Sequence, residues 1–195
     1  RERLERGRAR LRDAFLARPD TARLLRGLAR LTAAVLADVW RESRMPPGFA
    51  LLAVGGYGRG KLFPHSDIDV VILLDAAAAA HAASIERFLA TLWDVGLEIA
   101  HATRTLDECE REMAADITVR TSLLEHRRVA GSPRLARAFS ARFAATLDIR
   151  AFYSAKSLEQ QQRHLKYDDA LYNLEPNVKE SPGGLRDLQT VLWVS

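Results

Sequence analysis

Two aspartates stand one residue apart at the start of an apolar run, in the segment Ser66-Asp67-Ile68-Asp69-Val70. Side chains alternate between faces in an extended strand, so Asp67 and Asp69 are predicted to point the same way, with Cα atoms about 6 to 7 Å apart. Ile68 and Val70 then point to the opposite face, into a core. Two parallel carboxylates can share divalent metal, which stabilises the attacking and leaving oxygens of phosphoryl and nucleotidyl transfer. The segment therefore predicts metal-dependent nucleotidyl transfer.

A glycine pair precedes the aspartates and follows the apolar run 49–54. Glycine has no Cβ, so the backbone can turn sharply there and aim its N–H groups at a triphosphate. Two basic side chains lie nearby, and a serine beside the first aspartate has a hydroxyl that can donate to a phosphate oxygen. The residues expected to bind the nucleotide are Gly55, Gly56, Arg59, Lys61 and Ser66.

Such glycines and aspartates also occur for purely structural reasons. Aspartates at strand ends are common caps, and a glycine-rich loop alone is often only a tight connection. Residues 55–61 fit the G-x-x-x-x-G-K spacing, yet Leu62 stands where a P-loop needs Ser or Thr, and Pro64 obstructs the following helix. Gly56, Gly58 and Gly60 do not fit the dinucleotide fingerprint G-x-G-x-x-G. The joint pattern favours the metal site.

The string from Val54 to Asp69 resembles the polymerase-beta-like nucleotidyltransferase superfamily and, within it, the PII uridylyltransferase family. A second segment, residues 180–189, looks like that family's Gly-Gly-Leu-Arg-Asp segment. Lys61 departs from the family pattern, which has an acidic residue there, so its role stays open. The resemblance implies an α/β (α+β) fold: a polymerase-beta-like nucleotidyltransferase core with a small mixed sheet, flanked by N- and C-terminal helices.

The resemblance also implies a third carboxylate on a neighbouring strand after an intervening helix. Residues 84–94 have helical spacing, and residues 95–101 alternate like a strand. Glu98 is the candidate third metal ligand or general base; the alternative is an ordinary solvent-facing glutamate. Asp116 precedes an apolar run and is predicted to be an N-cap instead.

The activity implied is transfer of UMP from UTP to a tyrosine of the nitrogen-regulatory protein PII, with Mg²⁺ or Mn²⁺ as cofactor and pyrophosphate as product. The full enzyme is expected to carry an HD hydrolase domain for uridylyl removal and ACT domains that sense glutamine. No His-Asp doublet occurs here, so this chain is expected to be a fragment with the transferase half alone. Two alternatives stay open: adenylyl transfer to glutamine synthetase or another protein, and a non-catalytic nucleotide-binding regulatory module.

Composition sets limits on the class of protein. The chain has 195 residues, 48% of them hydrophobic, which is enough for a full core. The net charge is +4, and most of the positive charge comes from arginine. Basic helix faces are typically solvated, so nucleic-acid binding is not expected. A single cysteine, Cys109, excludes an internal disulfide and suits the cytoplasm, where it is expected to pack in a core. No signal peptide or membrane span is apparent.

Three segments are predicted. Residues 1–44 form an N-terminal helical segment, 45–130 the nucleotidyltransferase core, and 131–195 a helical region. Caps are expected at Thr105, which opens a capping box, and at Ser132, which precedes a proline.

The helical region holds further polar residues that could reach the nucleotide. Gly183-Gly184 could present amides to a phosphate, or could equally form a tight turn beside an Arg-Asp pair. The other polar residues, for which an exposed helix face is the alternative, are Lys156, Arg163, His164, Lys166 and Tyr167.

Overall fold

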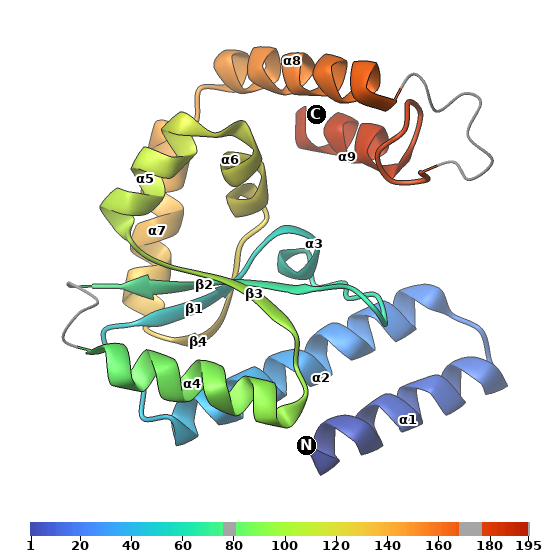
Figure 1. The fold of residues 1–195 in the computed structure, drawn as a ribbon, viewed down its shortest axis with the longest axis vertical. Helices are drawn as coiled ribbons and strands as arrows, with labels where there is room; N and C mark the ends of the chain where they lie inside the picture. Colours follow the sequence, from blue (N-terminus) through green and yellow to red (C-terminus); the bar gives the residue numbers. More distant parts are fainter. Residues whose placement is uncertain (76–80, 168–176, 195) are drawn as a thin grey trace.

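The computed structural model describes residues 1–75, 81–167 and 177–194. Helices and strands alternate through the first two thirds of the chain, and helices follow (Figure 1). The helices are α1 (Glu2–Ala17), α2 (Thr21–Glu42), α3 (Gly55–Gly58), α4 (Ala82–Val95), α5 (Leu106–Ala115), α6 (Ile117–Leu124), α7 (Pro133–Thr146), α8 (Ile149–Tyr167) and α9 (Leu185–Val194). The strands are β1 (Ala50–Ala53), β2 (Ile68–Leu74), β3 (Ile99–Thr105) and β4 (Arg127–Gly131).

Within the described residues the strands form one sheet in the order β3-β2-β1-β4. β1 pairs antiparallel with both β2 and β4, whereas β2 pairs parallel with β3. The β2–β3 connection passes through α4, as a parallel pair requires a crossover. The sheet is small and mixed and has helices on both sides, which confirms the predicted α/β fold (Figure 1).

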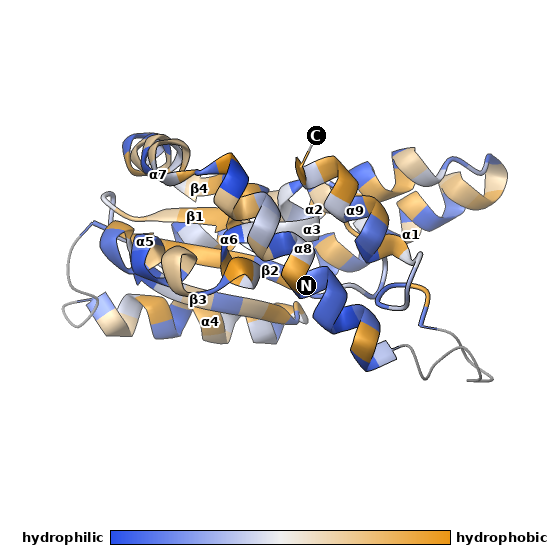
Figure 2. Cartoon of the chain, turned by 90° about the horizontal axis from the view of Figure 1, so that it is seen from above, coloured by the Kyte–Doolittle hydropathy of each residue, from blue (hydrophilic) through white to orange (hydrophobic). Residues whose placement is uncertain are grey.

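Alternation along β1 and β2 divides the core into two clusters. Leu51, Ile68, Val70 and Ile72 point to one face, where they pack with residues of α1, α2 and α4. Leu73 and its neighbours on the other face pack with α5, α6 and α7. Figure 2 shows both strands as mainly hydrophobic, between helices of mixed character. A sheet buried on both faces holds the start of β2 in a fixed position.

The predicted helix starts are present as hydrogen bonds. The Thr105 hydroxyl accepts from the Glu108 N–H, and the Glu108 carboxylate accepts from the Thr105 N–H, which confirms the capping box. Asp116 caps α6 through the Thr118 N–H, and Ser132 caps α7 through the Leu135 N–H.

The strand predicted over 95–101 starts later than expected. Val95 is the last residue of α4, and Gly96 ends that helix in the left-handed conformation at φ 85°. The N–H of Leu97 then bonds to the carbonyl of Leu92, as in a helix C-cap, and the pairing with β2 begins only at Ile99. Alternation of apolar residues through a glycine cap therefore gave the wrong boundary.

Helix α2 packs against the sheet, and α1 packs on α2 (Figure 1). Leu28, Val35, Leu36 and Val39 of α2 belong to the same cluster as Leu51 of β1. The boundary at residue 44 stays a prediction. Among the described residues, no helix combines the length and apolar character that crossing a membrane requires.

Candidate active site

A cavity of about 750 Å³ opens where β1 ends and β2 begins. This volume lies within the range typical of small-molecule sites. One wall comes from α3 and the loop that leads into β2, and the opposite walls come from α6, α8 and the segment 179–193. Residues that line the cavity include Gly55, Gly56, Arg59, Lys61, Ser66, Asp67, Asp69, Thr118, Ser122, Glu125, Lys156, Glu159, Lys179, Glu180, Arg186 and Trp193.

The two aspartates lie at the edge of this cavity. Ile68 and Val70 are buried, at 3% and 2% exposure, whereas Asp67 is exposed and Asp69 half-buried. Burial raises the pKa of Asp69, and the negative charge of Asp67 raises it further, while the charge of Lys179 acts in the opposite direction. The two carboxylates are therefore close enough to repel each other, with a lysine nearby.

The glycine bend lies beside the second aspartate. Gly55 begins α3 at φ 54°, a conformation that favours glycine. A Cβ at Gly55 would lie 3.6 Å from Asp69 Oδ2 and 3.6 Å from Ser122 Oγ. Side chains from β2 and α6 thus meet at this backbone position, and a larger residue there would narrow the space between them.

The donor set fits a magnesium-type ion. Such an ion takes hard oxygen ligands, often one or two carboxylates together with substrate phosphates. Asp67, directly before β2, and Asp69 within it provide two carboxylates that both line the cavity. Over the described ranges, no group of three or more His, Cys, Asp or Glu side chains could hold a metal ion.

Glu98 does not line the cavity. It is exposed and comes one residue before Ile99, which pairs with Ile68 of the parallel neighbouring strand. Asp67 occupies the corresponding place before Ile68, so the structure puts both acidic residues at the same end of adjacent strands. The role of Glu98 as third ligand or base stays a prediction.

The predicted nucleotide-binding residues all line the cavity, in different environments. Lys61 and Ser66 are exposed. Arg59 forms an ion pair with Glu125 at the C-terminal end of α6. Sequence reasoning placed Arg59 at the phosphates but did not identify this carboxylate partner.

Glutamates balance other cavity cations as well. Lys156 Nζ lies 2.8 Å from Glu159 Oε2, and a guanidinium nitrogen of Arg186 lies 3.2 Å from Glu180 Oε1. Lys156 is buried at 3% exposure, and the ion pair with Glu159 offsets the cost of burying its charge. The cavity therefore presents cations that are held in place by carboxylates.

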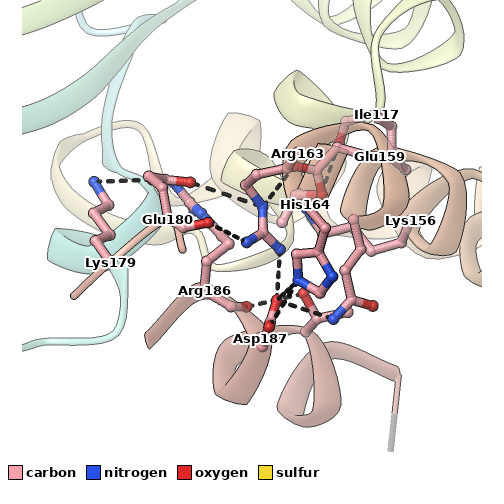
Figure 3. Close-up of polar contacts among 12 residues, drawn as sticks. Ile117, Lys156, Glu159, Arg163, His164, Lys179, Glu180, Arg186 and Asp187 are labelled. Atoms are coloured by element: carbon pink, nitrogen blue, oxygen red, sulfur yellow. Dashed lines mark hydrogen bonds and ion pairs between the residues drawn. The ribbon is translucent and has the colours of Figure 1, made fainter. Parts of the chain in front are cut away.

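Asp187, in the Gly-Gly-Leu-Arg-Asp segment, organises a cluster of polar side chains (Figure 3). It accepts hydrogen bonds from Arg163 at 2.8 Å, Gln160 at 2.9 Å and the Gly183 N–H at 2.7 Å, and His164 Nε2 lies 2.9 Å away. Burial alone would raise the pKa of Asp187, but these donors hold that pKa well below its usual range. The cluster fastens the start of α9 to α8.

The polar residues predicted in the helical region have different surroundings in the structure. Arg163 and His164 bind Asp187, and the Gly183 N–H donates to Asp187 as well. Arg186 pairs with Glu180 and not with Asp187. Lys156 lines the cavity. Lys166 lies over the ring of Tyr167 with 5.6 Å to its centroid.

Several cavity residues were not identified from the sequence. Thr118, Ser122 and Glu125 recur at spacings of four and three, which is the signal of one polar helix face. Lys179 and Trp193 lie far along the chain from the aspartates, and no local pattern distinguishes them. Their place in the site depends on how α8 and α9 fold back.

Known proteins match two parts of the chain. Residues 40–128 match a family model described as Nucleotidyltransferase domain, and residues 151–195 match one described as GlnD PII-uridylyltransferase. A mutant of the toxin-antitoxin MntA-HpeT, a solved structure, aligns at TM-score 0.39 and 13% identity, covering 71% of this chain and 98% of that chain.

Curated relatives carry the name "Bifunctional uridylyltransferase/uridylyl-removing enzyme". The protein from Burkholderia orbicola (strain MC0-3) is 53% identical over 184 residues, 94% of this chain and 21% of the relative. That from Burkholderia mallei (strain SAVP1) is 53% identical over 173 residues, 88% of this chain and 20% of the relative. The chain thus spans about a fifth of the length of these relatives. By both family models and by this identity, the chain belongs to the family of the bifunctional uridylyltransferase/uridylyl-removing enzymes and contains its nucleotidyltransferase domain.

Proposed function

We propose that this chain transfers UMP from UTP to a tyrosine of the PII signal protein and releases pyrophosphate. One observation carries the proposal: Asp67 and Asp69 open into a cavity in which Gly55 lies beside the Asp69 carboxylate. The names of the relatives support the choice of UMP and of PII.

The chain's own groups suit a bound triphosphate. The backbone of Gly55 and Gly56 can approach phosphate oxygens without side-chain obstruction. Lys61, Arg59 and the Ser66 hydroxyl add positive charge and a donor at the same wall of the cavity. These groups orient the α-phosphate toward the incoming acceptor, which is the main task of a phosphoryl-transfer site.

Asp67 and Asp69 would hold divalent metal, Mg²⁺ or Mn²⁺. When bound, the metal supplies Lewis-acid stabilisation of charge on the attacking and leaving oxygens. In the reaction the tyrosine oxygen forms a bond to the α-phosphorus, the bond from that phosphorus to pyrophosphate breaks, and the tyrosine gives up its proton. Glu98 is our candidate for the group that accepts this proton or completes the metal site.

Replacing either aspartate tests the proposal. Asp67→Asn and Asp69→Asn should each lower transfer of label from α-labelled UTP to PII by more than the 10- to 100-fold typical of residues behind a metal ligand. Asp94→Asn is the matched control, because Asp94 is exposed on α4 and does not line the cavity. Circular dichroism checks that all variants fold.

The same assay separates the alternative activities. Label from ATP in place of UTP would indicate adenylyl transfer, and binding of nucleotide without any transfer would indicate a regulatory module. Undiminished transfer by Asp67→Asn or Asp69→Asn would contradict the assigned metal site.

A further inference from the structure

We propose that Trp193 is a positioning residue: its indole N–H fixes Glu125, and Glu125 in turn holds Arg59 toward the nucleotide phosphates. The inference rests on the proposed function, since it assigns Arg59 to a bound triphosphate. It extends that function to α9, which lies far along the chain from the proposed metal ligand Asp69.

Glu125 has one partner at each carboxylate oxygen. Oε1 accepts a hydrogen bond of 2.9 Å from Trp193 Nε1, and Oε2 forms the ion pair with Arg59. The side chain of Glu125 is 15% exposed, so water cannot readily replace either partner. The residues that end α3 and α6 and a side chain of α9 therefore meet at one carboxylate.

The position of Glu125 is fixed on its main-chain side too. Gly58 packs so closely on the carbonyl of Glu125 that a Cβ there would lie 1.5 Å from the oxygen. The backbone of Glu125 thus stays beside the glycine loop, while its carboxylate can still rotate. The indole N–H limits that rotation and keeps Oε2 turned toward Arg59.

The hydrogen bond of Trp193 is separable from the packing of its ring. Lys156 Nζ lies 4.8 Å from the ring centroid, and the Arg186 guanidinium lies 5.9 Å from it. Phenylalanine keeps an aromatic face for both cations but has no N–H. Trp193→Phe therefore removes the contact to Glu125 selectively.

Nucleotide binding to the purified protein provides the test. Calorimetric titration with UTP and Mg²⁺, in the absence of PII, should show binding weakened by about tenfold or more for Trp193→Phe, as expected for loss of a hydrogen bond to a charged group. Trp93→Phe is the matched control, because Trp93 is 64% exposed on α4 and outside the cavity. Uridine, which lacks phosphates, should bind Trp193→Phe and the parent protein equally.

A double-mutant cycle tests whether the effect passes through Arg59. In an Arg59→Ala background, Trp193→Phe should cause no further loss of UTP affinity, because the residue it positions is absent. Glu125→Gln should resemble Trp193→Phe in binding UTP more weakly.

Each other outcome has a defined meaning. If Trp193→Phe binds UTP as tightly as the parent or more tightly, or if the two losses add, the positioning role is wrong while the proposed function stands. Equal weakening of uridine and UTP, with a lower melting temperature than Trp93→Phe, would show a structural role and overturn the inference. Failure of the parent protein to bind UTP at all would instead reject the proposed function.

Discussion

Gly56 and Gly58 are two residues apart in one short helix, yet their surroundings differ. A Cβ at Gly58 would collide with the backbone carbonyl of Glu125, which cannot move aside cheaply, whereas a Cβ at Gly56 would meet only the end of the Arg59 side chain at 3.4 Å. Gly58→Ala should therefore lower the free energy of unfolding by about 3 kcal/mol, and Gly56→Ala by less than about 1 kcal/mol. Urea denaturation of both variants measures this difference; equal costs would mean that the loop does not pack on α6 as described.

At the residue scale, the sequence predicted what local spacing controls. The alternation that separates Asp67 and Asp69 from Ile68 is a property of any strand, and burial of Ile68 against exposure of Asp67 confirms it. Glu125 could not be predicted in this way. Its partners Arg59 and Trp193 are 66 and 68 positions away, and no periodicity connects such positions.

The attachment of α9 to α8 depends on one ionised carboxylate. Asp187 has a lowered pKa, so its contribution to stability is complete above its unfolded pKa of about 4 and is lost as the pH falls toward the folded value. Asp187→Asn should lower the free energy of unfolding by about 2 to 3 kcal/mol at pH 7. This is less than the cost of leaving a buried charge fully unpaired, because Arg163 still has Glu159 as a partner at 3.3 Å.

Thermal unfolding by circular dichroism at several pH values tests this assignment. The difference in melting temperature between the parent protein and Asp187→Asn should be largest near pH 7 and shrink below pH 4. A difference that stays constant down to pH 3 would show that the charge of Asp187 does not provide the stabilisation.

Helix starts were predicted more accurately than the strand after α4. Thr105, Asp116 and Ser132 cap their helices through hydrogen bonds within three residues, so sequence neighbours carry the whole signal. The start of β3 depends instead on where pairing with β2 begins. Gly96 could be anticipated as a helix end, but the register with Ile68 is a long-range property.

Across the whole molecule, Cys109 reports on the integrity of the fold. It is the single cysteine of the chain, fully buried in the cluster shared by β1, β2, α5 and α7. Burial raises the pKa of its thiol to about 11, which confirms the expected packing role and suppresses the reactive thiolate. At pH 8, a thiol reagent should label the native protein more than about 100-fold more slowly than the urea-unfolded protein.

Labelling can be followed by absorbance or mass, with Cys109→Ala as the blank. Stoichiometric reaction of the native protein within minutes would contradict the burial of Cys109 between the sheet and its helices.

The order of the strands and the position of α8 and α9 over the cavity lay beyond sequence reasoning. β4, at residues 127–131, lies at the edge of the sheet beside β1 and not beside β3, which it follows in the chain. Such pairing is decided by the packing of both sheet faces and not by local preference. A resemblance to a family provided the fold class, and the residue patterns alone identified only the segments that build it.

Position 125 joins the glycine loop through two chemically independent parts. Its main-chain oxygen sets how near Gly58 can approach, whatever side chain is attached, while its carboxylate alone selects the orientation of Arg59. Replacing the side chain at position 125 therefore changes the charge beside the triphosphate without moving the glycine loop. A substitution at position 125 can therefore change the affinity for nucleotide and leave the fold as it is.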